Sequence, residues 1–339
     1  MQEIESQPRT WAQALDMAIA QRSALAVPGE RVLAIGCGTS AFMARSYAAL
    51  REQAGLGETD WAYAPEAPIG RRYDRVVAIS RSGTTTEVLE SLSSLPPRTR
   101  RVAVTAVSGK PIDDLTDDRV LLDFADETSV VHTRFPTTFL ALVRAALGLP
   151  VDHLVRDAEA ALPAPLPVDI RDYNHFAYLG TGWTTGLAHE AALKIHEAAL
   201  KIREAALKIR EAALKIREAA QAWSESYLGL DYRHGPVAVP GRRSLVWIFG
   251  PEPAGLAASV GKSGATMHVG ALDPLAELVV AQRLAVALAA ERGLDPDHPR
   301  LLTRSVVLSG MAVLPPTFAH VFANHSTVAP TAPSPGASL

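Results

Sequence analysis

The sequence predicts an α/β protein with two tandem lobes, each built on a doubly wound parallel sheet with flanking helices. Two observations carry this prediction. Short apolar segments alternate with helical segments of roughly 10–15 residues, which is typical of parallel strands joined by crossover helices. The alternation then starts again after the proline-rich segment 161–172. A third feature, a repeated heptad in one helix, sets this chain apart and is taken up last.

Composition shifts divide the chain into five predicted parts. These are an N-terminal helical segment at 1–30, a first lobe at 31–160, a linker at 161–172, a second lobe at 173–309 and a disordered tail at 310–339. The tail is rich in Pro, Ala, Thr and Ser and has no periodicity, so we expect no packed structure there.

The individual elements follow from hydrophobic periodicity. Trp11, Leu15, Ala18 and Ile19 are spaced as on one face of a helix. In the first lobe we predict strands at 31–38, 74–80, 101–107 and 115–125, with helices at 39–53 and 81–95. In the second lobe we predict strands at 175–182, 243–250 and 264–271, with helices at about 186–223 and at 274–293.

Composition excludes several classes of function. The 339 residues carry a formal net charge of -3, which offers no electrostatic reason to expect a nucleic acid or an anionic membrane as partner. A single cysteine, Cys37, allows neither an intramolecular disulfide nor a thiolate metal cluster. Because no long uncharged apolar run and no signal-peptide pattern occur, we expect a soluble cytoplasmic protein.

Two predicted strand-to-helix turns are crowded with small hydroxyl residues, "GCGTS" at 36–40 and "SRSGTTTE" at 80–87. Backbone N–H groups at a helix N-terminus form a natural anion seat, and hydroxyls there can donate further bonds. Neither turn is a dinucleotide fingerprint or a P-loop, so we predict no nucleotide cofactor and favour a smaller phosphate ester. The alternative is that these Ser and Thr side chains merely cap the following helices.

Histidines offer one candidate. His234 lies in the turn "YRHGP", where a catalytic ring is plausible, although a lone histidine is more often structural. His189 and His196 are seven residues apart on one helical face, which does not match the i,i+4 spacing of a zinc helix. We therefore predict no metal site.

Seven motifs occur in the order seen in the two-lobed sugar isomerase (SIS) family. They are "EIESQP", "GCGTS", "SRSGTTTE", "TSVVHTR", "HEAALKI…REAAQAWSESY", "DYRHGP" and "DPDHPRLLTRSVVL". The sequence most resembles the isomerase half of glucosamine-6-phosphate synthase and its stand-alone relatives, the amino-sugar phosphate isomerases and deaminases. The resemblance implies a phosphosugar-binding enzyme that acts on an amino- or keto-hexose 6-phosphate by enediol-type proton transfer, without a cofactor.

The resemblance also assigns residues. The phosphate and sugar contacts match Thr39, Ser40, Ser80, Ser82 and Thr85, the loop over the sugar matches Val130 and Thr133, and the helix supplies Lys194. The proton-transferring glutamate matches a Glu in the repeated helix. His234 matches the ring-opening histidine, which in the family reaches the neighbouring subunit's site, so a homodimer with shared active sites is implied.

The chain departs from the synthase in two respects. Arg304 stands where the synthase has a lysine, and an arginine is a poor imine former. We also expect no glutaminase half, which favours isomerisation or deamination over amidotransfer. The alternative is a phosphosugar-binding protein without catalytic activity, by nature or because the repeated helix has impaired the site.

The repeated helix contains one heptad written four times between Glu190 and Trp223, whereas the family has a single copy. Our hypothesis is an engineered insertion of three heptads, because natural drift blurs such copies. The alternative is a natural coiled-coil arm with a 3-4 stripe of Ala and Ile. We prefer the N-terminal register, which makes Glu197 the catalytic glutamate. The C-terminal register would use Glu218 and Lys215 instead.

Overall fold

The computed structural model describes residues 1–199, 223–297 and 307. Compactness divides the chain into Met1–Val306 and Val307–Leu339, and the elements below all belong to the first unit. The predicted tail at 310–339 and most of the heptad repeats lie outside the described residues.

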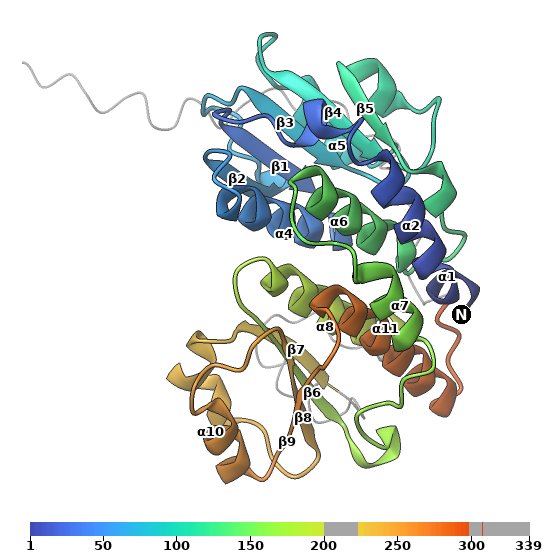
Figure 1. The fold of residues 1–339 in the computed structure, drawn as a ribbon, viewed down its shortest axis with the longest axis vertical. Coiled ribbons are helices and arrows are strands. Elements are labelled where there is room, and N and C mark those ends of the chain that lie inside the picture. The colour runs from blue at the N-terminus through green and yellow to red at the C-terminus, as the bar shows by residue number, and fades with distance from the viewer. Residues whose placement is uncertain (200–222, 298–306, 308–339) are drawn as a thin grey trace, which may run out of the picture. The chain divides into compact units, whose positions relative to one another are not determined.

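The first sheet is parallel throughout, with the strand order β2-β1-β3-β4-β5 (Figure 1). Its strands are β1 (Val32–Gly36), β2 (Thr59–Tyr63), β3 (Arg75–Ile79), β4 (Arg100–Thr105) and β5 (Asp118–Leu121). The central strands β1 and β3 are buried along their whole length, as continuous apolar runs in a sheet covered on both faces should be. The prediction of a doubly wound parallel sheet is therefore confirmed.

The second sheet repeats this design with four parallel strands in the order β7-β6-β8-β9. Its strands are β6 (His175–Gly180), β7 (Trp223–Leu228), β8 (Ser244–Phe249) and β9 (Thr266–Val269). In each sheet the first strand of the lobe is central, and the chain crosses from it to one side and then to the other. This reversal creates a crevice at the carboxyl ends of the strands, where ligands bind in such folds.

The helices connect and cover these strands. They are α1 (Gln2–Glu5), α2 (Gln7–Met17), α3 (Arg22–Leu25), α4 (Thr39–Gln53), α5 (Thr86–Ser93), α6 (Arg134–Ala146), α7 (Leu154–Ala161), α8 (Thr184–Ala199), α10 (Leu256–Ser263) and α11 (Pro274–Glu291). Short 3₁₀ helices include η5 (Asp231–His234) in the turn that follows β7.

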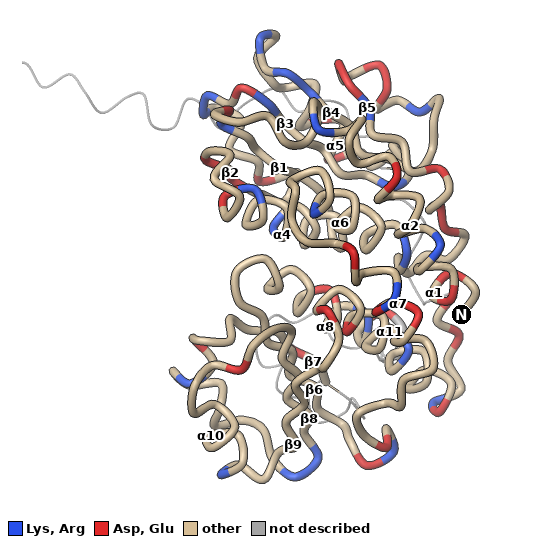
Figure 2. The backbone as a smooth tube through the Cα atoms, viewed as in Figure 1, with Lys and Arg blue, Asp and Glu red and all other residues tan. Residues whose placement is uncertain are grey.

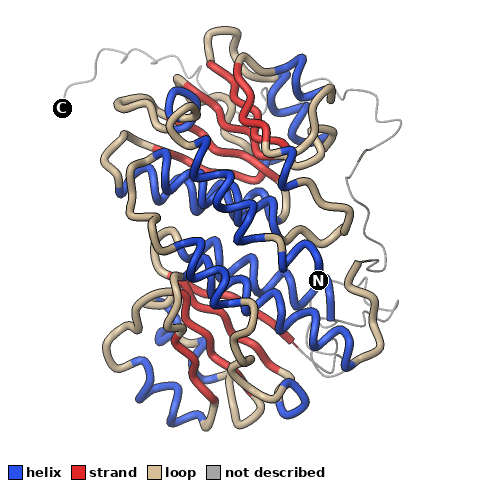
Figure 3. Tube along the Cα trace, turned by 45° about the vertical axis from the view of Figure 1, so that its right-hand side comes forward, coloured by secondary structure: helices blue, strands red, loops and turns tan. Residues whose placement is uncertain are grey.

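A layer of helices lies between the two sheets (Figure 3). Helix α4 packs on β1, α8 packs on β6, and α8 contacts both α4 and α11. The contact between α4 and α8 requires Gly186, because a Cβ there would lie 2.1 Å from Ser46 Oγ and 2.4 Å from the Phe42 carbonyl oxygen. Side chains of both lobes join one buried apolar cluster, which includes Val104, Phe139 and Phe249.

The sequence prediction missed two of the four edge strands, β2 and β7. The helix was predicted to end at about residue 223 and no strand was predicted directly after it, yet Trp223–Leu228 forms β7. Strand β2, with the sequence "TDWAY", was not predicted either. Both strands lie at a sheet edge and are only partly buried, so they lack the apolar run that reveals a central strand.

Charged residues are spread over both lobes of the described structure. Figure 2 shows basic and acidic residues interspersed along the backbone. Among the residues that the structure describes, no helix combines the length and apolar character needed to cross a bilayer.

Candidate functional site

The first hydroxyl-rich turn connects β1 to α4. Thr39 and Ser40 occupy the first turn of α4 and are buried. The backbone fits only because of two glycines: Gly38 has φ +53°, and a Cβ on Gly36 would lie 2.6 Å from the carbonyl carbon of Ser40. The turn therefore brings two hydroxyls and the N-terminus of a 15-residue helix to the crevice end of the sheet.

The second turn connects β3, the neighbour of β1, to α5. Ser80 Oγ lies 3.2 Å from Thr85 Oγ1, and Ser82 Oγ accepts a hydrogen bond from the Thr84 amide at 3.3 Å. Thr85 is the N-cap of α5 but makes no side-chain capping hydrogen bond there within the described chain. Simple helix capping therefore does not account for this cluster of hydroxyls.

Helix α8 supplies three charged residues to the same region. Lys194 Nζ lies 2.6 Å from Glu197 Oε2, 3.1 Å from Glu190 Oε1 and 3.4 Å from Thr39 Oγ1. Glu190 and Lys194 are almost wholly buried, whereas the Glu197 side chain is 20% exposed. Lys194 thus lies beside the first turn, and Glu197 is paired with it. Glu218 and Lys215 lie outside the described residues.

Burial sets the ionisation of this triad. Loss of hydration raises the pKa of Glu190 to about 7, against the opposing effect of the Lys194 ammonium. Burial alone would lower the pKa of Lys194, but the carboxylates of Glu190 and Glu197 outweigh it, and the net shift is upward. Lys194 therefore stays protonated at neutral pH, while Glu190 can hold or release a proton there.

A loop at 126–134 forms another wall of the site. Buried Glu127 organises it, because one of its carboxylate oxygens accepts hydrogen bonds from the Thr133 amide, the Thr133 hydroxyl and the Arg134 amide at 2.6, 2.7 and 2.8 Å. Buried Arg81, from the second turn, donates to the carbonyls of Glu127 and Ser129. The loop is thereby tied directly to the turn that carries Ser80 and Ser82.

A small cavity of about 30 Å³ opens between this loop, α1, α8 and α11, and its lining includes none of the predicted phosphate-binding residues Thr39, Ser40, Ser80, Ser82 and Thr85. Its lining includes Glu3 and Ile4 from α1, Ser129, Val131 and Thr133 from the loop, Lys194 from α8 and Gln282 from α11. Of the two loop residues predicted to face a ligand, Thr133 lines this cavity. Val130 is half-buried and does not, since its neighbours Ser129 and Val131 face inward instead.

His234 lies elsewhere. It is exposed at the end of η5 and lines a separate cavity of about 290 Å³ with Thr181, Leu230 and Asp231. The structure does not bring it to the Lys194 cavity within one chain. Arg304, the remaining predicted residue, lies outside the described residues. Among the residues with coordinates, no group of three or more His, Cys, Asp or Glu side chains could hold a metal ion.

Three buried charged residues of this site were not predicted as such: Arg81, Glu127 and Glu190. Each is an ionisable residue next to an apolar or hydroxyl-rich motif. The i,i+4 spacing of Glu190 and Lys194 could have predicted their ion pair. The contacts of Arg81 with Glu127 and Ser129 span more than 40 positions, and no local pattern reports them.

Two parallel sheets, each with its first strand in a central position, define a two-lobed α/β fold. No protein-family model matches the chain. It is 26% identical, over 82% of its length, to the isomerizing glutamine–fructose-6-phosphate aminotransferase of Thermotoga maritima, and 25% identical, over 90%, to that of Acidithiobacillus ferridurans. The chain spans about half the length of these relatives, 52% and 58% respectively.

Solved structures with the same fold span nearly the whole chain. A glucosamine-6-phosphate deaminase from Thermotoga maritima superposes with a TM-score of 0.73 at 23% identity, covering 91% of this chain and 99% of its own. A tagatose-6-phosphate ketose/aldose isomerase from Escherichia coli gives 0.69 at 18%, covering 92% and 96%. The chain therefore has the two-lobed SIS fold of these structures, and its sequence is similar to part of the isomerizing aminotransferases.

Proposed function

We propose that this protein is an isomerase or deaminase of an amino- or keto-hexose 6-phosphate. The observation that carries the proposal is the ion pair of Lys194 and Glu197 on α8, in which Lys194 Nζ also lies 3.4 Å from the hydroxyl oxygen of Thr39. The two turns would bind the phosphate, which fixes the sugar relative to α8. The names of the relatives, which act on fructose 6-phosphate, glucosamine 6-phosphate or tagatose 6-phosphate, support this substrate class.

Glu197 is proposed as the base. Its carboxylate would remove the proton from C2 of the open-chain aldose and return it to C1, so that an enediol forms and collapses to the ketose. Negative charge develops on the substrate oxygens during this transfer. Lys194, kept protonated by its two carboxylate neighbours, would stabilise that charge.

His234 is proposed to act on a neighbouring subunit. It is exposed and lines a cavity distinct from that of Lys194, as expected for a residue that completes a partner's site. This makes the functional unit a homodimer, for which we also propose a cytoplasmic location. In a symmetric homodimer, the same surface of each subunit can complete the site of its partner.

Hydrogen exchange at the sugar carbons tests the proposal. In D₂O, the wild-type protein should catalyse the incorporation of deuterium at C1 or C2 of fructose 6-phosphate or glucosamine 6-phosphate. This incorporation is measured by NMR. Glu197→Gln should slow this exchange by about 10²–10⁴-fold, the usual contribution of a general base. Glu159→Gln, an exposed change on α7, serves as the matched control and should leave the rate unchanged.

Each other outcome has a definite meaning. Undiminished exchange in Glu197→Gln together with loss in Glu218→Gln would assign the base to the C-terminal register. A thermal shift with these sugar phosphates but no exchange in the wild type would make the protein a phosphosugar-binding protein instead.

A further inference from the structure

The motif "EIESQP" at residues 3–8 has no role in the chemistry proposed above, yet it lies against the cavity. Glu3 is on α1 and lines the cavity together with Lys194. One oxygen of its carboxylate, Oε1, accepts hydrogen bonds from the Thr128 amide at 2.6 Å, the Thr128 hydroxyl at 3.1 Å and the Ser129 amide at 3.2 Å. Three donors of the cavity loop thus converge on a single charged oxygen.

Two other polar residues of the motif, Ser6 and Gln7, hold the far end of the same loop. Ser6 Oγ accepts a hydrogen bond from Arg134 Nη1 at 3.0 Å. Gln7 Nε2 donates to Gln282 Oε1 at 2.7 Å, and Gln282 Nε2 donates to the Thr133 carbonyl at 3.2 Å. Gln7 and Gln282 are buried, so these bonds are shielded from competition with water.

The loop held in this way is the part of the wall that a ligand would meet. Ser129 and Thr133, at the two attachment points, and Val131 between them all line the cavity. Glu127 fixes the base of the loop, but its bonds go to residues 133 and 134 and to Phe135. The amides of Thr128 and Ser129 are instead held by Glu3, across more than 120 positions of sequence.

We propose that Glu3 is a positioning residue, which holds the 128–133 loop in the conformation that binds the sugar phosphate. The proposal rests on the proposed function for its ligand. Hydrogen bonds to a charged acceptor are about twice as strong as neutral ones, so one carboxylate can order the two amides. Without the Glu3 carboxylate, the ligand would have to order the loop when it binds. The entropy lost in that ordering would weaken binding.

Amide hydrogen exchange and steady-state kinetics, measured on the full chain, test this role. Glu3→Ala should speed exchange at Thr128 and Ser129 by roughly tenfold or more, the effect expected for losing hydrogen bonds to a charged group. It should raise KM for fructose 6-phosphate by a similar factor while kcat changes less than about twofold. Glu3→Gln keeps an acceptor oxygen, so its exchange rates and its KM should lie between those of the wild type and those of Glu3→Ala.

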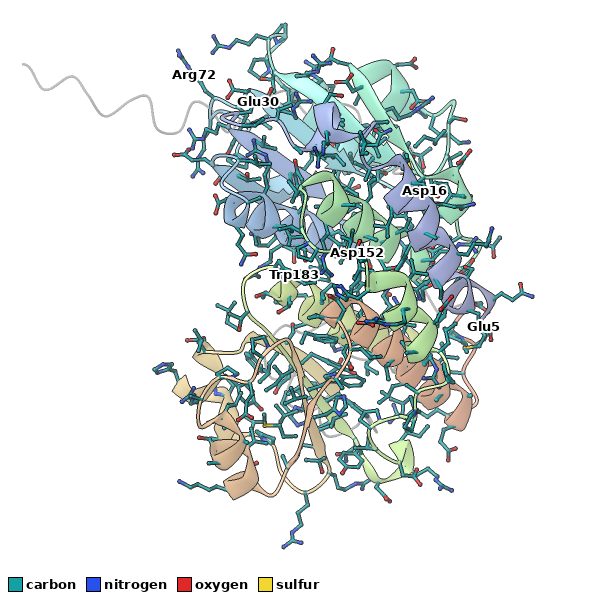
Figure 4. All side chains as sticks on the ribbon, viewed as in Figure 1. Glu5, Asp16, Glu30, Arg72, Asp152 and Trp183 are labelled. Carbon is teal, nitrogen blue, oxygen red and sulfur yellow. The ribbon has the colours of Figure 1, made fainter. Side chains whose placement is uncertain are left out.

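The matched control is Glu5→Ala, on the same helix, whose side chain is exposed and labelled in Figure 4. The proposal fails if Glu3→Ala and Glu5→Ala give the same exchange at Thr128 and Ser129. It also fails if Glu3→Ala lowers kcat and leaves KM unchanged. A wild-type protein without turnover would refute only the proposed function. The amide exchange rates of Thr128 and Ser129 in Glu3→Ala would still test whether Glu3 orders the loop.

Discussion

At the scale of single residues, the site depends on charges placed where water cannot reach them. Glu190 is fully buried, and both of its oxygens lack a hydrogen bond of good geometry within the described chain, although Lys194 lies 3.1 Å away. A buried carboxylate of this kind is expensive unless it takes up a proton or a partner compensates its charge. Its cost to stability should therefore depend on pH.

The pH dependence has a definite sign. Burial raises the pKa of Glu190 from its ordinary value of 4.5 to about 7, so between these values the native state binds a proton that the unfolded chain has released. Stability should accordingly fall as the pH rises through this window and level off above it. Glu190→Gln stays neutral, so its Tm should fall less between pH 5 and pH 8 than that of the wild type.

Thermal unfolding at several pH values checks this, with Glu159→Gln as the exposed control. An identical pH profile in Glu190→Gln and wild type would show that Glu190 is ionised in the native state throughout. Lys194 does not contribute to the pH dependence in this window, because its pKa is raised above the ordinary lysine value of 10.5.

At the scale of elements, predictability follows burial. Strands β1 and β3 were evident because both are apolar throughout and end in turn residues. The edge strands β2 and β7 were not, because "TDWAY" and "WSESYL" carry polar residues on their open sides. The hydroxyl turns could be located from sequence, whereas the tie of Arg81 to the loop is a tertiary contact without a local signature.

Helix packing supplies a prediction at this scale. Gly186 sits where α4 and α8 approach closely, and the added methyl of Gly186→Ala would meet Phe42 and Ser46. We expect a loss of about 1–3 kcal/mol in the free energy of unfolding, typical of overpacking. Gly261→Ala in α10, where nothing lies within 4 Å, should instead gain up to about 1 kcal/mol. Urea denaturation measures the free energy of unfolding of both variants. Equal changes in Gly186→Ala and Gly261→Ala would contradict the packing argument.

At the scale of the whole molecule, the heptad repeats can be tested by removing them. Ser224 at the start of β7 donates to the Ala192 carbonyl at 2.8 Å and lies 3.2 Å from His196 Nδ1. The chain therefore returns from the repeats to the place where it left α8. Deleting residues 198–218 would leave four residues, 219–222, to span that short connection.

Under the insertion hypothesis, this deletion should raise the Tm and the exchange activity, because the family form of the helix is restored. Deleting a single heptad, 198–204, is the comparison and should give a smaller gain. A deletion protein that fails to fold would refute the hypothesis and favour the coiled-coil arm.

The proposed sharing of sites between subunits predicts complementation. Glu197→Gln and His234→Asn should each be inactive alone, yet a refolded equal mixture should regain roughly a quarter of the wild-type activity, because half of the dimers then contain one intact site. A mixture that stays inactive, or a protein that sediments as a monomer, would contradict the shared site.

The apolar cluster that spans the helix layer has one more consequence. Phe139 and Val104 from the first lobe share it with Phe249 and Leu288 from the second, so neither lobe completes this part of its interior alone, although each also has an apolar cluster of its own. A lobe released by cutting the linker would present half of that interior to water. We therefore expect the two lobes to unfold together in one cooperative transition.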